Sequence, residues 1–266
     1  MKLKIHDVAF KYTSTPIIEN ICMEITRSEL AIICGPNGVG KSTLIRCINR
    51  ILQPHTGSIL LDGQEIMSMR MRELARRMGY VSQSSSGVFP VTVFDMILMG
   101  RRPYLGWRSS ESDIEKVVEI LRLMDIEDLA LRDFNELSGG QQQKVVISRA
   151  LAQEPDILLL DEPTSNLDIR HQLEAMEIIR NLVTEKSVSV IMAIHDLNLA
   201  SQYADKVIMM KGGRIFKTGD PRSVVTPENI SAVYEIESVV KLESGKPYIV
   251  PIRHRRKQEK LYDEKR

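Results

Sequence analysis

The sequence predicts an α/β protein with a parallel sheet, an antiparallel β part at its N-terminus and an inserted helical segment. After residue 155, short apolar runs at 157–160, 188–194 and 206–210 alternate with helix-like segments, as in βαβ units. Up to residue 26, apolar and polar residues alternate instead, which favours half-exposed strands. From residue 93 to 152 the helical period dominates. Together these patterns indicate one large α/β unit with one insertion.

The N-terminal part contains the predicted antiparallel strands. In one of them, Ile21, Met23 and Ile25 alternate with Cys22, Glu24 and Thr26, so the apolar set lies on a single face. A short helix follows at 72–77. The strands expected before residue 90 are 3–5, 8–10, 21–25, 57–63 and 79–83.

The helical insertion contains one clear amphipathic pattern. Its apolar residues recur at helical spacing along one face and are Ile114, Val117, Val118, Leu121 and Met124. Towards the C-terminus, residues 211–214 predict a hairpin turn. The basic residues 253–257 are followed by acidic ones, so a solvated end is favoured there over a nucleic-acid site.

Composition excludes few classes of function. The 266 residues include 36 Lys and Arg against 35 Asp and Glu, and the net charge of +1 offers no argument for nucleic acid as a partner. The cysteines Cys22, Cys34 and Cys47 lack CxxC spacing and stand in apolar patterns, which predicts buried, reduced thiols. No apolar run reaches the ~18–20 residues of a membrane span, and the first residues do not resemble a signal peptide.

A glycine-rich loop carries the first chemical signal. It follows the apolar run 30–34 and precedes a helix-like segment, the context in which a phosphate-binding P-loop occurs. Its glycines let backbone N–H groups face phosphate oxygens, and the helix adds its positive end. The pattern predicts a nucleoside triphosphate, and the alternative is a glycine-rich turn without that role. Its residues are Gly35, Pro36, Asn37, Gly38, Val39, Gly40, Lys41, Ser42 and Thr43.

Within this loop, two side chains have expected roles. Lys41 has the reach to contact the β- and γ-phosphates, and the Ser42 hydroxyl is a ligand for Mg²⁺. A second element, the apolar run ending in Asp161 and Glu162, places a carboxylate at the end of a strand, where it holds Mg²⁺ or its water. Glu162 is placed to accept a proton from an attacking water. Alone this second pattern is weak, because many strands end in acidic residues.

A third element is the segment 137–141, Leu-Ser-Gly-Gly-Gln. Ser138 is expected to cap a helix that continues to Gln153, before Pro155 ends it. Gly139 and Gly140 then expose backbone N–H groups at a second phosphate-facing helix N-terminus. The alternative is an ordinary Ser-Gly cap in a helical subdomain.

With these motifs in order, nearly the whole chain resembles the ATPase subunits of ABC transporters. The matching motifs are the P-loop at 35–43, the Q-loop Gln83, the signature 137–141, the Walker B run 157–161 with Glu162, the D-loop 165–168 and the switch His195. The resemblance implies a RecA-like P-loop NTPase core at 1–86 and 152–240, with a helical signature subdomain at 87–151. These form one ABC ATPase domain over 1–240, followed by a C-terminal extension over 241–266.

The resemblance also implies a nucleotide sandwich in which two copies face each other head to tail. Each ATP then lies between one P-loop and the other copy's signature, where Ser138 and Gly140 bind the γ-phosphate in trans, beside Gly139 and Gln141. Tyr12 would stack on adenine, or else be a core tyrosine. Gln83 would contact Mg²⁺ or the attacking water, and His195 the γ-phosphate and that water. Asp168 belongs to the nucleotide site through the D-loop, in which Asn166 replaces the commoner alanine.

A narrower resemblance points to importers of iron chelates (siderophores), haem and cobalamin. It rests on the stretches 101–107, 167–172 and 226–234, of which the first lies where the family contacts its permease. It implies a peripheral protein on the cytoplasmic face of the membrane, bound to a multi-spanning permease and served indirectly by an external substrate-binding protein. Nucleic acid is not expected as a partner.

Three alternatives differ in class. The first is an ABC-type ATPase for another cargo. The second is a soluble ABC ATPase acting on nucleic acid or ribosomes, but no heptad run lies between Lys41 and Leu137 and the chain has a single P-loop. The third is a P-loop kinase or metallochaperone, neither of which needs the segment 137–141.

Overall fold

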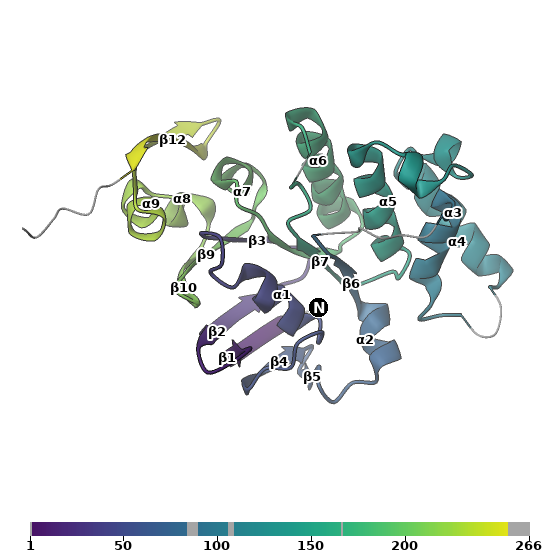
Figure 1. Ribbon diagram of the computed structural model, residues 1–266, viewed down its shortest axis with the longest axis horizontal. Coiled ribbons are helices and arrows are strands. Elements are labelled where there is room, and N and C mark those ends of the chain that lie inside the picture. Colours follow the sequence, from purple (N-terminus) through teal and green to yellow (C-terminus); the bar gives the residue numbers. More distant parts are fainter. Residues whose placement is uncertain (1, 84–89, 106–108, 166, 255–266) are drawn as a thin grey trace, which may run out of the picture.

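The computed structural model describes residues 2–83, 90–105, 109–165 and 167–254 (Figure 1). Among the described residues, six strands form a sheet in the order β10-β9-β3-β8-β7-β6. Five of them run parallel, and β10 pairs antiparallel with β9. The predicted parallel sheet is therefore confirmed. Its strands are β3 Leu30–Cys34, β6 Met78–Val81, β7 Ile157–Asp161, β8 Ser189–Ala193, β9 Lys206–Lys211 and β10 Arg214–Gly219.

Alternate residues of the central strands belong to two separate apolar cores. In β3, Leu30 and Ile32 lie in one core and Ala31 and Ile33 in the other. Because side chains alternate between the faces of a strand, the sheet is buried on both sides. The helices α6 Ile169–Glu185 and α7 Leu197–Tyr203 contribute to the first core, and α1 Lys41–Ile48 to the second.

The predicted antiparallel part lies below α1 in Figure 1 and completes the second core. In this described part the strand order is β2-β1-β4-β5. The two short strands expected at 3–5 and 8–10 are one strand, interrupted between Ile5 and Val8 by a register shift where Asp7 has a φ of 50°. Its strands are β1 Leu3–Lys11, β2 Pro16–Ile25, β4 Thr56–Leu61 and β5 Gln64–Glu65.

One predicted cysteine environment is wrong. Cys34 and Cys47 are buried, but Cys22 is exposed and its sulfur accepts a hydrogen bond from the Asp7 amide at 3.2 Å. The reason is the period of β2, because Ile21 and Met23 point into the core and turn Cys22 outward.

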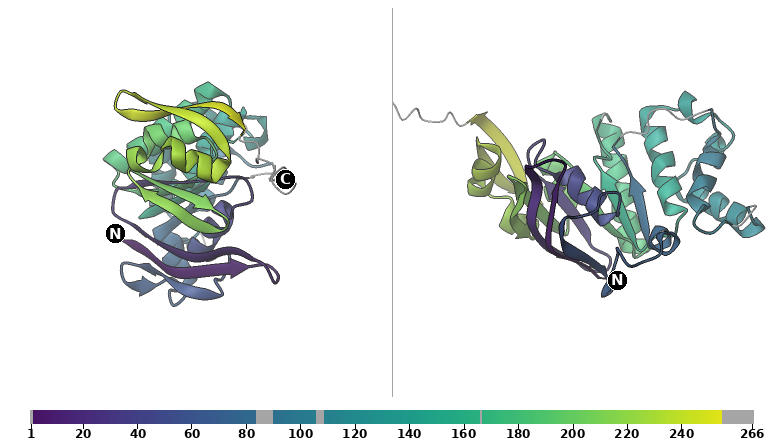
Figure 2. Two further views of the ribbon diagram at one scale, coloured as in Figure 1. Left: turned by 90° about the vertical axis from the view of Figure 1, so that its left-hand side faces the viewer. Right: turned by 60° about the horizontal axis from the view of Figure 1, so that its bottom comes forward.

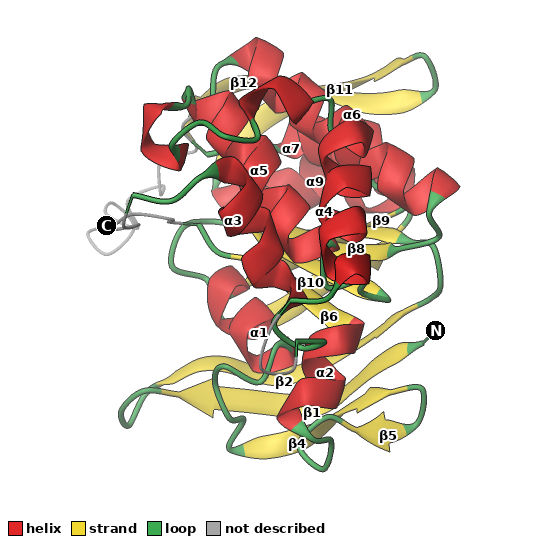
Figure 3. Cartoon of the chain, turned by 90° about the vertical axis from the view of Figure 1, so that its right-hand side faces the viewer, coloured by secondary structure: helices red, strands yellow, loops and turns green. Residues whose placement is uncertain are grey.

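The inserted segment is helical, as expected, and lies to one side of the sheet (Figures 1 and 3). The apolar face predicted for α4 is wrong at Ile114, which is 43% exposed. Ile120 is buried instead, together with the carboxylate of Asp113, because Asp113 pairs inside with Arg101. The described elements are α3 Val93–Leu98, η1 Met99–Arg101, α4 Glu111–Leu123, η2 Glu127–Leu129, η3 Phe134–Glu136 and α5 Gly139–Leu151.

The C-terminal part ends in a two-stranded hairpin that packs on α7 and on α9 Pro227–Tyr234 (Figure 2). The division predicted at residue 240 stays a prediction, and the strand β11 Ile236–Glu243 runs across that residue. The remaining elements are α2 Met71–Arg77, α8 Pro221–Val224 and β12 Lys246–His254.

Within the described ranges, no helix has both the length and the hydrophobicity that crossing a bilayer requires. Asn166, residues 106–107 of the stretch 101–107 and the tail beyond His254 lie outside the described residues.

Candidate nucleotide-binding site

The glycine loop lies between β3 and the N-terminal end of α1, as the sequence predicts. Gly40 precedes the helix with a φ of 102°, and a side chain there would place Cβ 2.5 Å from Cγ2 of Ile18 in β2. Glycine is therefore required both by the backbone conformation and by the close approach of β2. Val39 and Thr43 pack inward, whereas Asn37 and Gly38 are exposed at the turn of the loop. The exposed turn beside a helix N-terminus is an anion-binding arrangement.

Lys41 is buried within this loop, with only 5% of its surface exposed. Its ammonium donates to the carbonyl oxygens of Gly35 and Pro36, at 2.8 Å and 3.2 Å. Burial lowers the pKa of Lys41, and the nearby carboxylate of Glu162 opposes that shift. The ammonium is thus held against the carbonyl oxygens at the start of its own loop.

Ser42 and Asp161 meet across the gap between α1 and the end of β7. The Ser42 hydroxyl donates to Oδ1 of Asp161 at 2.7 Å, and burial raises the pKa of this fully buried carboxyl. Among the described residues, Oδ2 of Asp161 accepts no hydrogen bond, and the Arg46 guanidinium lies 3.8 Å away. A buried carboxylate oxygen without a donor next to a hydroxyl fits Mg²⁺, which prefers oxygen ligands.

Few protein side chains would bind the ion in such a site. No group of three or more His, Cys, Asp or Glu able to hold a metal occurs in the described part of the chain. Mg²⁺ at phosphate sites commonly uses one or two protein carboxylates together with phosphate oxygens.

Glu162 and Gln83 also meet at this edge of the sheet. Gln83 Nε2 donates to Oε2 of Glu162 at 2.8 Å. Glu162 has a φ of 52°, an uncommon left-handed conformation for a glutamate, and its amide donates to the Ala193 carbonyl at 3.0 Å. The chain therefore turns sharply after Asp161, and the two neighbouring parallel strands β6 and β7 bring the amide and the carboxylate together.

His195 and Tyr12 border the site from two other elements. His195 follows β8, which lies between the P-loop strand β3 and the Walker B strand β7, and it is exposed. Tyr12 follows β1, and its ring, 58% exposed, meets Phe10 edge-on at 4.9 Å between centroids. Tyr12 is therefore no core tyrosine, and its ring is available for stacking.

The signature segment has the predicted cap and lies apart from the P-loop. Ser138 caps α5 through a capping box, in which its amide donates to Oε1 of Gln141 at 3.0 Å and its hydroxyl accepts from the Gln141 amide. The neighbours of Gly139 and Gly140 are Leu167 and His171. Within one chain, the signature thus contacts the D-loop and α6 rather than residues 35–43.

Asp168 is the N-terminal cap of α6. Its Oδ1 accepts from the amide and from Nδ1 of His171, both at 2.9 Å, and these hydrogen bonds lower the pKa of Asp168.

In the stretch 101–107, Arg101 is buried and Arg102 is the exposed arginine. Sequence reasoning missed Arg46 beside Asp161, although its place four residues after Ser42 on α1 put both on one helix face.

Comparison with known proteins gives one family. Residues 18–165 match the model described as "ABC transporter". An uncharacterised ABC transporter ATP-binding protein of Methanocaldococcus jannaschii is 49% identical over 95% of this chain and 98% of its own. The ferric enterobactin transport ATP-binding protein of Escherichia coli K12 is 36% identical over 94% of both chains.

Solved structures agree with the sequence matches. An inward-facing ABC transporter assigned to the metal-chelate type has a TM-score of 0.83 at 26% identity, covering 94% of this chain and 97% of the other. A dimeric ATP-binding cassette in a post-hydrolysis state, bound to ADP and phosphate, has a TM-score of 0.71 at 29% identity, with 82% and 98% covered.

Proposed function

Because the chain belongs to the ABC transporter family, we propose that it drives uptake of an iron–siderophore, haem or cobalamin-type complex as the ATPase subunit of an importer. The chain is an ABC ATPase, and the family binds ATP. The import of a metal chelate is supported by the relative named for ferric enterobactin and by the metal-chelate-type transporter of similar fold. The cargo itself is selected by proteins other than this one.

One observation carries the assignment of the site: the Ser42–Asp161 and Gln83–Glu162 pairs lie at the same edge of the sheet as the glycine loop. Lys41 and the backbone N–H groups of residues 35–43 bind the β- and γ-phosphates. Ser42 and Asp161 hold Mg²⁺, which when bound neutralises charge on the phosphate oxygens.

Hydrolysis requires a base, and Glu162 is the proposed one. The hydrogen bond from Gln83 Nε2 holds one carboxylate oxygen, and the other faces the attacking water and accepts its proton. His195 contacts the γ-phosphate and orients that water. Tyr12 stacks on the adenine, since its ring is exposed.

The site is completed by a second copy of the chain. Ser138 and Gly140 bind the γ-phosphate held by the partner, with Gly139, Gln141 and Asp168 beside them. This is supported by the packing of the two elements in one chain, where α5 packs on α3 and α6 whereas α1 packs on β7 and β8, and by the dimeric cassette of similar fold. ATP closes the dimer and hydrolysis reopens it.

The further partners are a multi-spanning permease and, through it, an external substrate-binding protein. The chain then sits peripherally on the cytoplasmic face of the membrane, and nucleic acid is no partner. The closing and opening of the dimer drive the permease.

Replacement of Glu162 by Gln tests the chemistry. The variant is expected to lose about 10²–10⁴-fold in ATP turnover, because the base is removed while the side-chain volume is kept. Glu65→Gln, on the exposed strand β5, is the matched control and should turn over ATP as the unaltered protein does. Normal turnover in Glu162→Gln would refute the assignment.

Fractionation tests the transport role against the alternative of a nucleic-acid ATPase. Recovery in membranes only when a permease is co-expressed supports the importer. Co-sedimentation with nucleic acid that weakens steeply with salt would instead support the other class.

A further inference from the structure

The first turn of the signature helix α5 lies against a side chain from the first turn of another helix, α6. A Cβ atom at Gly140 would lie 2.7 Å from Cγ and 2.9 Å from Nε2 of His171, distances that no real side chain adopts. Only a glycine lets the α5 backbone approach the imidazole this closely. The signature backbone therefore lies directly against the His171 ring.

The ring in turn is fixed by the D-loop. Nδ1 of His171 donates to Oδ1 of Asp168 at 2.9 Å, and the backbone amide of His171 donates to the same oxygen. The lowered pKa of Asp168 keeps this carboxyl ionised at neutral pH, so it acts as an acceptor only. One imidazole thus contacts Asp168 through its Nδ1 edge and Gly140 through its carbon and Nε2 atoms.

Little free space remains beside the ring. A pocket of about 10 Å³, room for no more than one water molecule, is bounded there by Gly140, His171 and Gln143 and by the apolar side chains of Ile147, Leu167 and Ile178. Nε2 of Gln143 is buried there and, among the described residues, has no hydrogen-bond acceptor. The ring therefore lies at the edge of the apolar contact between α5 and α6, next to Ile147 and Ile178.

We propose that His171 is a positioning residue that couples the D-loop to the signature loop. The proposal rests on the shared nucleotide site, in which Ser138 and Gly140 bind the partner's γ-phosphate. His171 holds the N–H groups of the first turn of α5 in the position that the phosphate requires. Any displacement of Asp168 moves the ring and, through it, the signature backbone.

Two variants separate the contacts of the ring. His171→Phe keeps a ring under Gly140 and removes the donor to Asp168. His171→Asn keeps a donor at the place of Nδ1 and removes the ring. If both contacts are needed, each variant raises the KM for ATP and the ATP-dependent dimer dissociation constant by about tenfold, while kcat at saturating ATP changes less than about twofold.

The dimer constant is measured in the Glu162→Gln background, and His6→Phe and His6→Asn, on exposed β1, are the controls. A merely structural role would lower thermal stability without this split between KM and kcat. The coupling is overturned if either His171 variant keeps the KM and dimer constant of the parent, or if kcat alone falls. Failure of the Glu162→Gln protein to dimerise at all would instead refute the shared site, so the two failures are distinguishable.

Discussion

At the scale of single residues, opposite charges are buried close together beside the glycine loop. Burial lowers the pKa of Lys41 and raises that of Asp161, so each shift favours the neutral form. The attraction between them opposes both shifts, and the Ser42 hydroxyl further stabilises the Asp161 carboxylate. These groups are costly to bury without ligands, which is typical of a site built for phosphate and a cation rather than for stability.

Tyr12 gives a prediction at this scale. Tyr12→Ala should weaken ATP binding by about 1–3 kcal/mol, which is roughly a 5- to 150-fold rise in Kd, because base–aromatic stacking is lost. Tyr12→Phe should bind ATP as the parent does, since the ring remains. Isothermal titration calorimetry measures both, with Tyr248→Ala on the exposed face of β12 as the control. Equal affinity in Tyr12→Ala would remove Tyr12 from the site.

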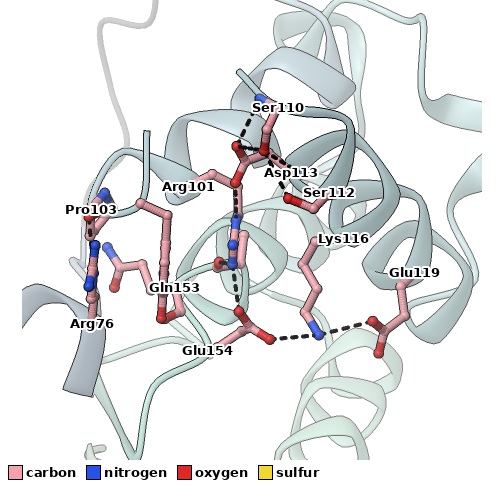
Figure 4. A network of polar contacts seen from close by, with 12 residues as sticks. Arg76, Arg101, Pro103, Ser110, Ser112, Asp113, Lys116, Glu119, Gln153 and Glu154 are labelled. Carbon is pink, nitrogen blue, oxygen red and sulfur yellow. Dashed lines mark hydrogen bonds and ion pairs between the residues drawn. The ribbon is translucent and has the colours of Figure 1, made fainter. Parts of the chain in front are cut away.

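At the scale of elements, one buried arginine joins the helical insertion to the core (Figure 4). Arg101 donates to Asp113 on α4 at 3.0 Å, and to the Ala152 carbonyl and the Glu154 carboxylate at 2.8 Å each. Its guanidinium lies 4.0 Å from the ring centroid of Tyr104. The segment that carries Arg101 is thus held between α4 and the end of α5.

Arg101→Met should destabilise the protein by about 3–5 kcal/mol at pH 7, because Asp113 is left as a buried charge without its cation. Lys116→Met is the control: its pairs with Glu119 and Glu154 are partly exposed, and its loss should cost about 1 kcal/mol or less. Urea denaturation measures both. A cost for Arg101→Met no larger than that of the control would contradict a buried ion pair.

The same pair has a pH dependence of known sign. The hydrogen bonds from Ser110, and then Arg101, lower the pKa of Asp113, so its stabilisation is present above the unfolded pKa of about 3.9 and is lost as pH falls through the folded value. The difference in unfolding free energy between Arg101→Met and the parent should therefore shrink below about pH 4. A difference that grows on acidification would contradict this sign.

The hairpin β11–β12 is attached to the helix that follows His195. Asn198 on α7 donates to the Ile249 carbonyl at 3.2 Å and accepts from the Ile249 amide at 2.8 Å. Asn198→Leu leaves both backbone groups of β12 without these partners and should cost about 1–3 kcal/mol, with faster hydrogen exchange at Ile249. Gln202→Leu, exposed on the same helix, should change stability by less than about 0.5 kcal/mol. Unchanged exchange at Ile249 in Asn198→Leu would refute the attachment.

At the scale of the whole molecule, local patterns predicted most of the fold. The glycine loop, the Ser138 cap and the parallel strands each follow from a few neighbouring residues, so sequence reasoning found them. Ile114 was assigned to the wrong face, because its spacing fits a helical stripe and only the distant Arg101 turns Asp113 inward.

The contacts within the candidate site depend on strand order. Gln83 meets Glu162 because β6 is the neighbour of β7, and the sequence does not specify that neighbour. The approach of Gly140 to His171 likewise joins residues from separate helices. Such pairs are set by packing across the chain, which periodicity and motifs do not describe.

The central claim is that two copies share each ATP, and the molecular mass of Glu162→Gln with and without ATP and Mg²⁺ tests it most directly. By analytical ultracentrifugation, the variant should be a dimer with two bound ATP when nucleotide is present and a monomer when it is absent. Adding Ser138→Asp keeps a residue that caps α5 but sets a carboxylate against the partner's phosphate, so it should abolish the dimer. Thr226→Asp, at the cap of α9, is the control and should dimerise. A Glu162→Gln protein that stays monomeric with ATP, or a Ser138→Asp protein that still dimerises, would contradict the shared site.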